Sequence, residues 1–376
     1  MVTYTNYGDQ ALAPDVAFAA DGKAAVVWTD TEGGAWTIKV ANRAPGASIW
    51  SAPTTLSLPG NGIIEGSSEP KIRFDAQGNG IALWVHWSNG TAAVPAYNII
   101  QSSSYTPGSG WSQPVDLSPK GVYRVSAYDL AVNAAGDMVV VWNLPDVTTN
   151  QISLQSIRKP AGSTAWSIPV TLTTDPSSLG GRDRKVVIDD AGRATVAWSS
   201  NFYGLYAVQS TATGDWGFPQ LVSNDPYNNE PQLTTDKAGN VTLAWFWYAD
   251  AYVNVGVKAR MLAAGSSTWT TAVKLSSPLW YERGQFPKVA ASPDGSRVVV
   301  MWDDAYDAYA SIYNPAKGWG LGWSAPIKLA PVAAVQRFGY DTISVFAGSG
   351  GSAHAVWSAI APNNIDTEIL GVTLTP

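Results

Sequence analysis

Residue types that could act on a glycosidic bond occur at several places along the chain. Tyr281 and Glu282, in the segment PLWYERG at 278–284, could form a nucleophile pair, and Asp303 could supply a carboxylic acid. Glycoside hydrolysis by the common route needs two facing carboxyl groups. His86 is one of only 2 histidines and could serve as the base of a polysaccharide lyase. If the protein is an enzyme, we expect these four residues to be catalytic, although no motif fixes their geometry.

Aromatic side chains outside the regular repeat of the sequence suggest binding rather than catalysis. They include Trp87, Trp247, Tyr248, Trp280 and Tyr281, all in segments that we expect on one loop face. Flat rings with polar groups at their rims suit the apolar faces and polar edges of sugars. Packing of one loop against another is the alternative explanation.

Arginines form the third group of candidate residues. Arg124, Arg184, Arg283 and Arg337 fall in loops of the same expected face, although the protein as a whole is acidic. Guanidinium groups bind carboxylate, sulfate or phosphate through paired hydrogen bonds. The same loops also contain glutamates, so ion pairs among the loops are the alternative: Glu65, Glu69, Glu230 and Glu282.

The elements that position these residues follow an internal repeat of roughly 55 residues, a period typical of solenoids, propellers and arrays. A glycine precedes a tryptophan by six residues in six units and by seven in another: Gly22/Trp28, Gly78/Trp84, Gly136/Trp142, Gly192/Trp198, Gly239/Trp245, Gly351/Trp357 and Gly295/Trp302. Apolar residues alternate before each tryptophan, as in Met138, Val140 and Trp142, which indicates half-buried strands. Polar turns such as DAQG at 75–78 predict a hairpin before them.

The first six units end in the pattern W-x-x-P-x-x-L-S or a looser copy of it, so we expect four antiparallel strands per unit. The repeat predicts an all-β fold, a seven-bladed β-propeller forming a single domain over 1–376. The last unit stops without its fourth strand, and MVTYT at 1–5 matches the end of a unit, so this segment is expected to close the ring. The units cover approximately 14–57, 70–118, 128–173, 184–223, 231–276, 287–330, and 343–376 plus 1–5.

Composition excludes several classes of protein. The net charge of −6, with only 14% charged residues, argues against a nucleic-acid partner. The sequence contains neither a run of apolar residues long enough to span a membrane nor a recognisable leader. The absence of cysteine excludes disulfides, and no metal-ligand spacing is present, so we expect no cofactor. The oligomeric state is left open.

The repeat P-x-V-x-x-x-x-x-G-x-A-x-A-x-W followed by W-x-x-P-V-x-L-S resembles that of secreted bacterial propellers of the sialidase-like and lectin-like kind. The resemblance implies a location outside the cell or on its surface. It does not extend to the S-x-D-x-G-x-x-W box of sialidases, because the interval from glycine to tryptophan is longer here. Three functions remain open: a lectin or adhesin that binds a glycan, a glycoside hydrolase or polysaccharide lyase acting on an acidic glycan, and a protein-interaction scaffold.

Overall fold

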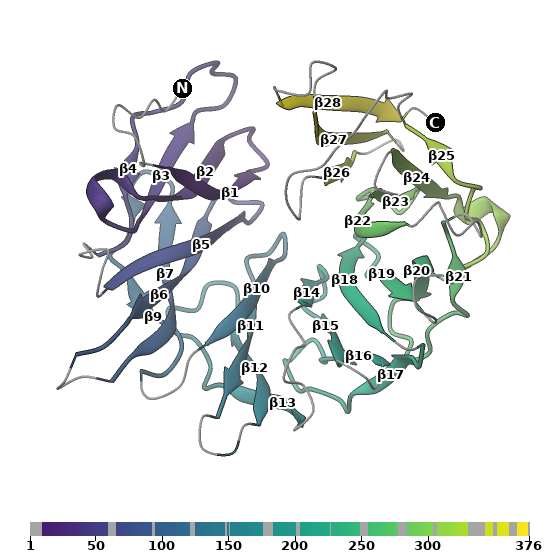
Figure 1. Ribbon diagram of the computed structural model, residues 1–376, viewed down its shortest axis with the longest axis horizontal. Helices are drawn as coiled ribbons and strands as arrows, with labels where there is room; N and C mark the ends of the chain where they lie inside the picture. Colours follow the sequence, from purple (N-terminus) through teal and green to yellow (C-terminus); the bar gives the residue numbers. More distant parts are fainter. Residues whose placement is uncertain are drawn as a thin grey trace. The chain divides into compact units, whose positions relative to one another are not determined.

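Among the residues that it describes, the computed structural model has antiparallel β-strands and two short 3-10 turns, η1 (Glu32–Gly34) and η2 (Pro315–Lys317) (Figure 1). The chain divides into two compact units, Met1–Pro176 and Ser177–Pro376, which are described separately. The structure describes residues 10–58, 65–91, 95–120, 125–146, 149, 151–175, 183–200, 204–225, 227–248, 255–276, 284–303, 307–329, 343–348, 352–360 and 367–374.

The first unit contains three sheets, each with its strands in chain order. The second of them has a fifth strand, β9, which pairs with β7. Their strands are β1 (Ala11–Phe18), β2 (Ala24–Asp30), β3 (Thr37–Arg43) and β4 (Thr54–Thr55); β5 (Glu65–Phe74), β6 (Gly80–Ser88), β7 (Tyr97–Thr106), β8 (Gly110–Trp111) and β9 (Val115–Asp116); and β10 (Ser126–Val132), β11 (Met138–Pro145), β12 (Ile152–Lys159) and β13 (Val170–Asp175).

The second unit contains three four-stranded sheets and one sheet for which three strands are described. Their strands are β14 (Arg184–Ile188), β15 (Ala194–Ser200), β16 (Gly204–Gln209) and β17 (Gln220–Ser223); β18 (Asn228–Thr235), β19 (Val241–Tyr248), β20 (Val255–Leu262) and β21 (Val273–Lys274); β22 (Gln285–Ala291), β23 (Val298–Asp303), β24 (Ala308–Tyr313) and β25 (Ile327–Lys328); and β26 (Ile343–Ala347), β27 (Ala353–Ile360) and β28 (Thr367–Leu374).

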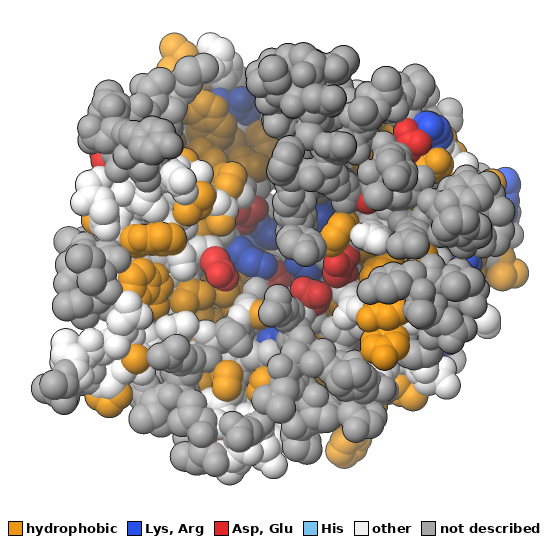
Figure 2. Space-filling model, in the orientation of Figure 1, with side chains coloured by type: hydrophobic (Ala, Val, Ile, Leu, Met, Phe, Trp, Pro, Cys, Tyr) orange, Lys and Arg blue, Asp and Glu red, His pale blue; other side chains and the backbone are white. Residues whose placement is uncertain are grey.

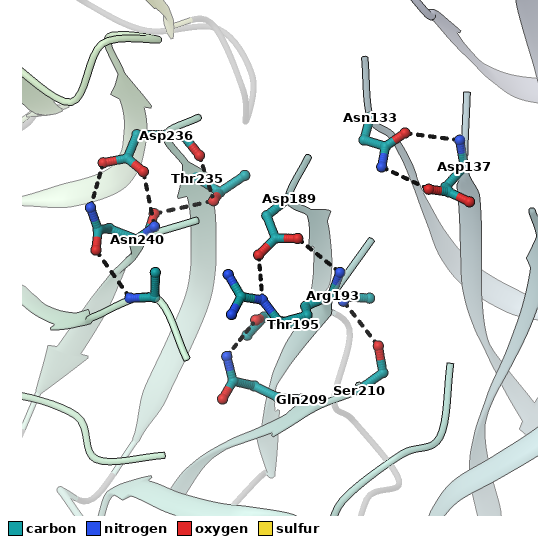
Figure 3. A network of polar contacts seen from close by, with 12 residues as sticks. Asn133, Asp137, Asp189, Arg193, Thr195, Gln209, Ser210, Thr235, Asp236 and Asn240 are labelled. Atoms are coloured by element: carbon teal, nitrogen blue, oxygen red, sulfur yellow. Dashed lines mark hydrogen bonds and ion pairs between the residues drawn. The ribbon is translucent and has the colours of Figure 1, made fainter. Parts of the chain in front are cut away.

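Short polar turns join the first two strands of the sheets, as the sequence predicts. In the β18–β19 turn, Asp236 accepts the backbone N–H of Asn240 at 2.9 Å and its side-chain amide at 2.8 Å (Figure 3). Gly239, at φ +87°, supplies the left-handed residue that this tight turn needs. The β10–β11 turn uses the reverse pair, with Asn133 donating to Asp137 at 2.9 Å. The side chains therefore take the backbone N–H groups that the reversing chain leaves unpaired.

The first strands carry a feature that the sequence analysis did not anticipate. Five of them, β1, β5, β10, β18 and β22, shift register at a β-bulge. The residue with positive φ at each bulge is not a glycine: Ala13, Glu69, Ala127, Glu230 and Phe286. In four of the five it precedes the proline of the repeat, which explains that proline, because a bulge frees a strand position from the need for a ladder N–H.

The repeat tryptophans of the second strands form cores between successive sheets. Trp142 is fully buried and packs with Leu83 and Ile100 of the preceding sheet. In the second unit Trp245 packs in the same way against Ala197 and Leu205. The tryptophans near the start of the fourth strands lie at the margins of these cores, and one of them, Trp50, is 38% exposed. Packing between neighbouring sheets, the expectation for the repeat tryptophans, thus holds best for the second strands.

The expected all-β fold with antiparallel, mostly four-stranded sheets is confirmed. Residues 1–9 lie outside the described residues, so the expectation that MVTYT closes a ring keeps the status of a prediction. In the described part of the chain no helix is long and apolar enough to cross a membrane.

Candidate functional site

The candidate residues that the structure describes lie at one end of their sheets, where the first and third strands begin and the second ends. We call this end the loop edge. In the β5–β9 sheet, Glu65, Ser88 and Tyr97 lie opposite one another there. In the β18–β21 sheet the corresponding end holds Trp247 and Tyr248. Neighbouring strands therefore bring together side chains that are far apart in the sequence.

A chain of polar contacts, which we call the Glu65 patch, links Ser67, His86, Glu65 and Tyr97 at the loop edge of the first unit. His86 Nδ1 lies 3.2 Å from Ser67 Oγ, and Nε2 lies 2.9 Å from Glu65 Oε1. The Tyr97 hydroxyl donates to the same carboxylate oxygen at 3.3 Å. Because a carboxylate only accepts, a neutral His86 carries its proton on Nε2 and accepts from Ser67 on Nδ1.

Exposure differs sharply within the Glu65 patch. Ser67 is fully buried and the His86 side chain is 3% exposed, whereas the Glu65 side chain is 41% exposed. Both nitrogens of His86 are occupied by protein groups, so the histidine orients Glu65 rather than facing a ligand. Burial first, and then the negative charge of Glu65, raise the pKa of Tyr97, which keeps the phenol protonated as a donor.

Trp87 follows the patch on β6 and packs against Trp36, with ring centroids 6.3 Å apart in an edge-to-face arrangement. Gly66 lies beneath both residues, since a side chain there would come within 2.7 Å of each. Trp87 is half-buried: part of its ring packs against Trp36, and the rest of the side chain is exposed to solvent.

A pair of stacked tyrosines, which we call the Tyr227 platform, lies at the loop edge of the β18–β21 sheet. The rings of Tyr227 and Tyr248 are 4.4 Å apart and almost parallel, at 3°. Tyr227 is 40% exposed and has a φ of +53°, which is uncommon for a bulky residue. The strained backbone and the stack together present a flat aromatic face.

Trp247 precedes Tyr248 on β19, and two lysine ammonium groups lie against its ring. The Lys258 ammonium is 3.8 Å from the ring centroid and that of Lys274 is 5.6 Å away. Lys258 also pairs with Asp225 at 2.6 Å. Burial, and then the neighbouring Lys258, lower the pKa of Lys274. One face of Trp247 is thus used by lysine, which leaves less of it for stacking on a sugar.

The remaining candidates divide into buried residues and residues outside the described ones. Arg184 begins β14 and is 4% exposed, and Asp303 ends β23 with the same exposure, so neither presents a broad surface. The described residues do not include the others: Arg124, Trp280, Tyr281, Glu282, Arg283 and Arg337.

Charged side chains of both signs also meet along the first strands of the first unit. Lys71 pairs with Asp129 at 2.6 Å, and Arg73 pairs with Asp15 at 2.7 Å. Figure 2 shows acidic and basic side chains interspersed among the described residues of one face. These ion pairs join successive sheets. The sequence analysis considered such ion pairs as an alternative role for the loop arginines and glutamates, which are other residues.

Sequence reasoning missed Ser67, Tyr97, Tyr227 and Lys258 as site residues. Ser67 and Lys258 follow the ordinary strand pattern and carry no local signal. Tyr227 stands in NDPYNNE, a loop rich in turn-forming residues, where an aromatic side chain is out of place, and that contrast could have identified it.

No protein-family model matches the chain, and the search of characterised proteins gave no match. Solved structures do resemble it. A polysaccharide lyase of family PL25, an ulvan lyase, has a TM-score of 0.56 at 11% identity, covering 98% of this chain and 94% of its own. The polysaccharide lyase Uly1 gives 0.52 at 9% identity, covering 93% and 87%. Prolyl oligopeptidase B from Galerina marginata gives 0.54 at 11% identity, covering 97% of this chain and 51% of its own. At such identities the likeness concerns the fold alone, and it supports a propeller-like architecture.

Proposed function

We propose that the protein is a carbohydrate-binding propeller that holds a glycan at the loop edge of its sheets. The Glu65 patch is the observation that carries this proposal. Its carboxylate is oriented by His86 and Tyr97 yet remains 41% exposed, so it can accept hydrogen bonds from sugar hydroxyls without first being ordered. The Tyr227 platform supplies, in the second unit, an aromatic face suited to a sugar ring.

Binding fits this geometry better than hydrolysis. Hydrolysis by the common route needs two carboxyl groups on opposite sides of the bond. Glu65 is the one carboxylate among the described residues of the patch, and His86 is enclosed by protein contacts. Cleavage of an acidic glycan by a glycoside hydrolase or polysaccharide lyase is the second candidate function. It is favoured by the hydrogen bond between Tyr97 and Glu65, because such a pair could exchange a proton with a substrate.

The test combines a glycan array with calorimetric titration of the glycans that bind. Glu65→Gln should weaken their affinity roughly tenfold to 100-fold, because a charge-assisted hydrogen bond contributes about 1.5–3 kcal/mol. Glu32→Gln is the matched control, since Glu32 is also exposed but lies in η1, paired with Lys39. Equal affinity of the wild type and Glu65→Gln would contradict the proposed site.

The same samples distinguish the other functions. Release of reducing ends or unsaturated uronates from a polysaccharide panel, lost in Tyr97→Phe, would establish an enzyme instead. An array without any bound glycan would overturn the carbohydrate proposal and favour a protein-interaction scaffold.

The finer architecture is part of this proposal. We propose a single domain of seven blades in which residues 1–5 pair beside β28 and complete the last blade, and an extracellular or cell-surface location for it. Seven sheets are present in the described chain, and the last has three strands where most have four, which supports both the blade count and the missing strand.

A further inference from the structure

A cavity of about 450 Å³ lies in the first unit, at the opposite end of the strands from the Glu65 patch. It opens between the β5–β9 and β10–β13 sheets, beside the polar turns. Its lining includes Asn79, Tyr105, Met138 and Lys159. We call it the hairpin pocket. Its volume falls in the range of about 300–1,000 Å³ that is usual for small-molecule sites.

Two other sheets have a long side chain at the position that lines this pocket. The residue after the turn glycine is Lys23 in the first sheet, and it crosses to Tyr105 of the next sheet, donating to the hydroxyl at 3.2 Å. The same position is Arg193 in the β14–β17 sheet, where the guanidinium lies against Gly239 and Gly265 of the following sheet. In the β5–β9 sheet this position is Asn79, whose short side chain leaves the space open.

Asn79 also lacks a hydrogen bond that is made by the residues at the same position of two other sheets, Asp137 and Asn240. Asp137 accepts the backbone N–H of Ala161 at 3.0 Å, and Asn240 accepts that of Ala264 at 3.0 Å. Both alanines are the second residue of a four-residue turn whose third residue is a glycine at φ +72°. The equivalent turn in the β5–β9 sheet has Pro107 in the second place.

Proline has no N–H to donate. Within the described chain the Asn79 side-chain oxygen therefore makes no hydrogen bond, while its amide group is held on Asp75 at 2.8 Å. The orientation of Asn79 is fixed and its acceptor faces an accessible space. An ordered, unsatisfied acceptor of this kind is a ready partner for a ligand hydroxyl.

The charge of the hairpin pocket comes from Lys159, which makes no ion pair among the described residues. The other charged group, Asp75, is 6% exposed and accepts hydrogen bonds from its own turn at Gln77 and Asn79. A ligand with a carboxylate for Lys159, a hydroxyl for Asn79 and an apolar face for Met138 matches these groups. We propose that the hairpin pocket binds a uronic acid residue. The choice of ligand rests on the proposed carbohydrate-binding function, whereas the site is separate from the Glu65 patch.

The test is calorimetric titration with methyl glucuronide and, for comparison, methyl glucoside. The wild type should bind the glucuronide more tightly. Pro107→Ala introduces a backbone N–H at the position from which Asp137 and Asn240 accept one in their own sheets. This N–H should occupy the Asn79 oxygen and so weaken ligand binding about three- to tenfold. Lys159→Gln should weaken glucuronide binding about tenfold or more and leave the glucoside unchanged.

Pro45→Ala is the matched control, because Pro45 holds the same place in the equivalent turn of the first sheet, before Gly46 at φ +68°. It should bind methyl glucuronide as the wild type does. Unchanged affinity in folded Pro107→Ala and Lys159→Gln would overturn the hairpin pocket. The hairpin pocket would also be overturned if the protein did not bind methyl glucuronide while its binding of array glycans depended on Glu65. That result would leave the proposed function intact. An absence of binding to every glycan would overturn both.

Discussion

Exchanging the two side chains of one polar turn tests the hydrogen-bond account of the repeat. In the β18–β19 turn the acid comes first, as Asp236, and the amide second, as Asn240. In the β10–β11 turn the order is reversed, with Asn133 first and Asp137 second. The double change Asp236→Asn with Asn240→Asp therefore places in the second unit a pair that the first unit already contains.

Each single change should break the pair in its own way. Asp236→Asn sets two amide groups face to face, because Asn240 cannot turn its oxygen toward the new amide without losing the N–H of Ala264. One lost hydrogen bond with an unsatisfied donor costs about 1–3 kcal/mol of unfolding free energy. Asn240→Asp sets two carboxylates side by side at a comparable cost of about 1–3 kcal/mol, which should shrink at acidic pH as one of them takes up a proton.

The double variant should recover to within about 0.5 kcal/mol of the wild type, so the two changes should show a coupling free energy of at least about 1.5 kcal/mol. Urea unfolding followed by tryptophan fluorescence, with all four proteins in one buffer, measures this coupling. A double variant as unstable as the sum of its single changes would refute the reasoning, since it would show that the pairing of these side chains does not stabilise the turn.

Three further predictions concern the core, alkaline pH and the first residues. Trp142→Ala, at a fully buried position, should lower the unfolding free energy by about 3–5 kcal/mol in urea titrations, whereas Trp50→Ala, at a position 38% exposed, should cost clearly less. Burial raises the pKa of Tyr128 well above its ordinary value of 10, so above pH 10 the unfolded chain loses a proton that the folded chain keeps. The midpoint of urea unfolding should therefore fall as the pH rises, and it should fall less steeply in Tyr128→Phe. Deletion of residues 1–8 should lower the melting temperature strongly if they complete the last blade, and an unchanged value in calorimetry would contradict that closure.

The strand repeat was predictable because its signals are local. A glycine at a fixed distance from a tryptophan, with alternating apolar residues between them, marks one hairpin wherever it occurs. The polar turns were equally legible, since Asp236 and its counterparts bond to residues only four positions away. Contacts of this range need no knowledge of the neighbouring sheets.

The Glu65 patch was not predictable, because it depends on the bulge in β5. Ile72 pairs with Ala82, and an uninterrupted ladder counted from there would set Ser67 opposite Trp87. The bulge shifts the register by one residue and sets Ser67 opposite His86 instead. A non-glycine residue in the left-handed region, Glu69, leaves no mark in the sequence except the proline after it.

The bulged first strands also affect how the protein behaves before it is fully folded. Each of these strands is at the edge of its sheet, the position where exposed backbone can pair with another chain. A proline next to a left-handed residue interrupts the row of N–H groups that such pairing needs, as at Glu69 and Pro70. We therefore expect the bulged edges of a partly folded nascent chain to pair less readily with the strands of neighbouring chains.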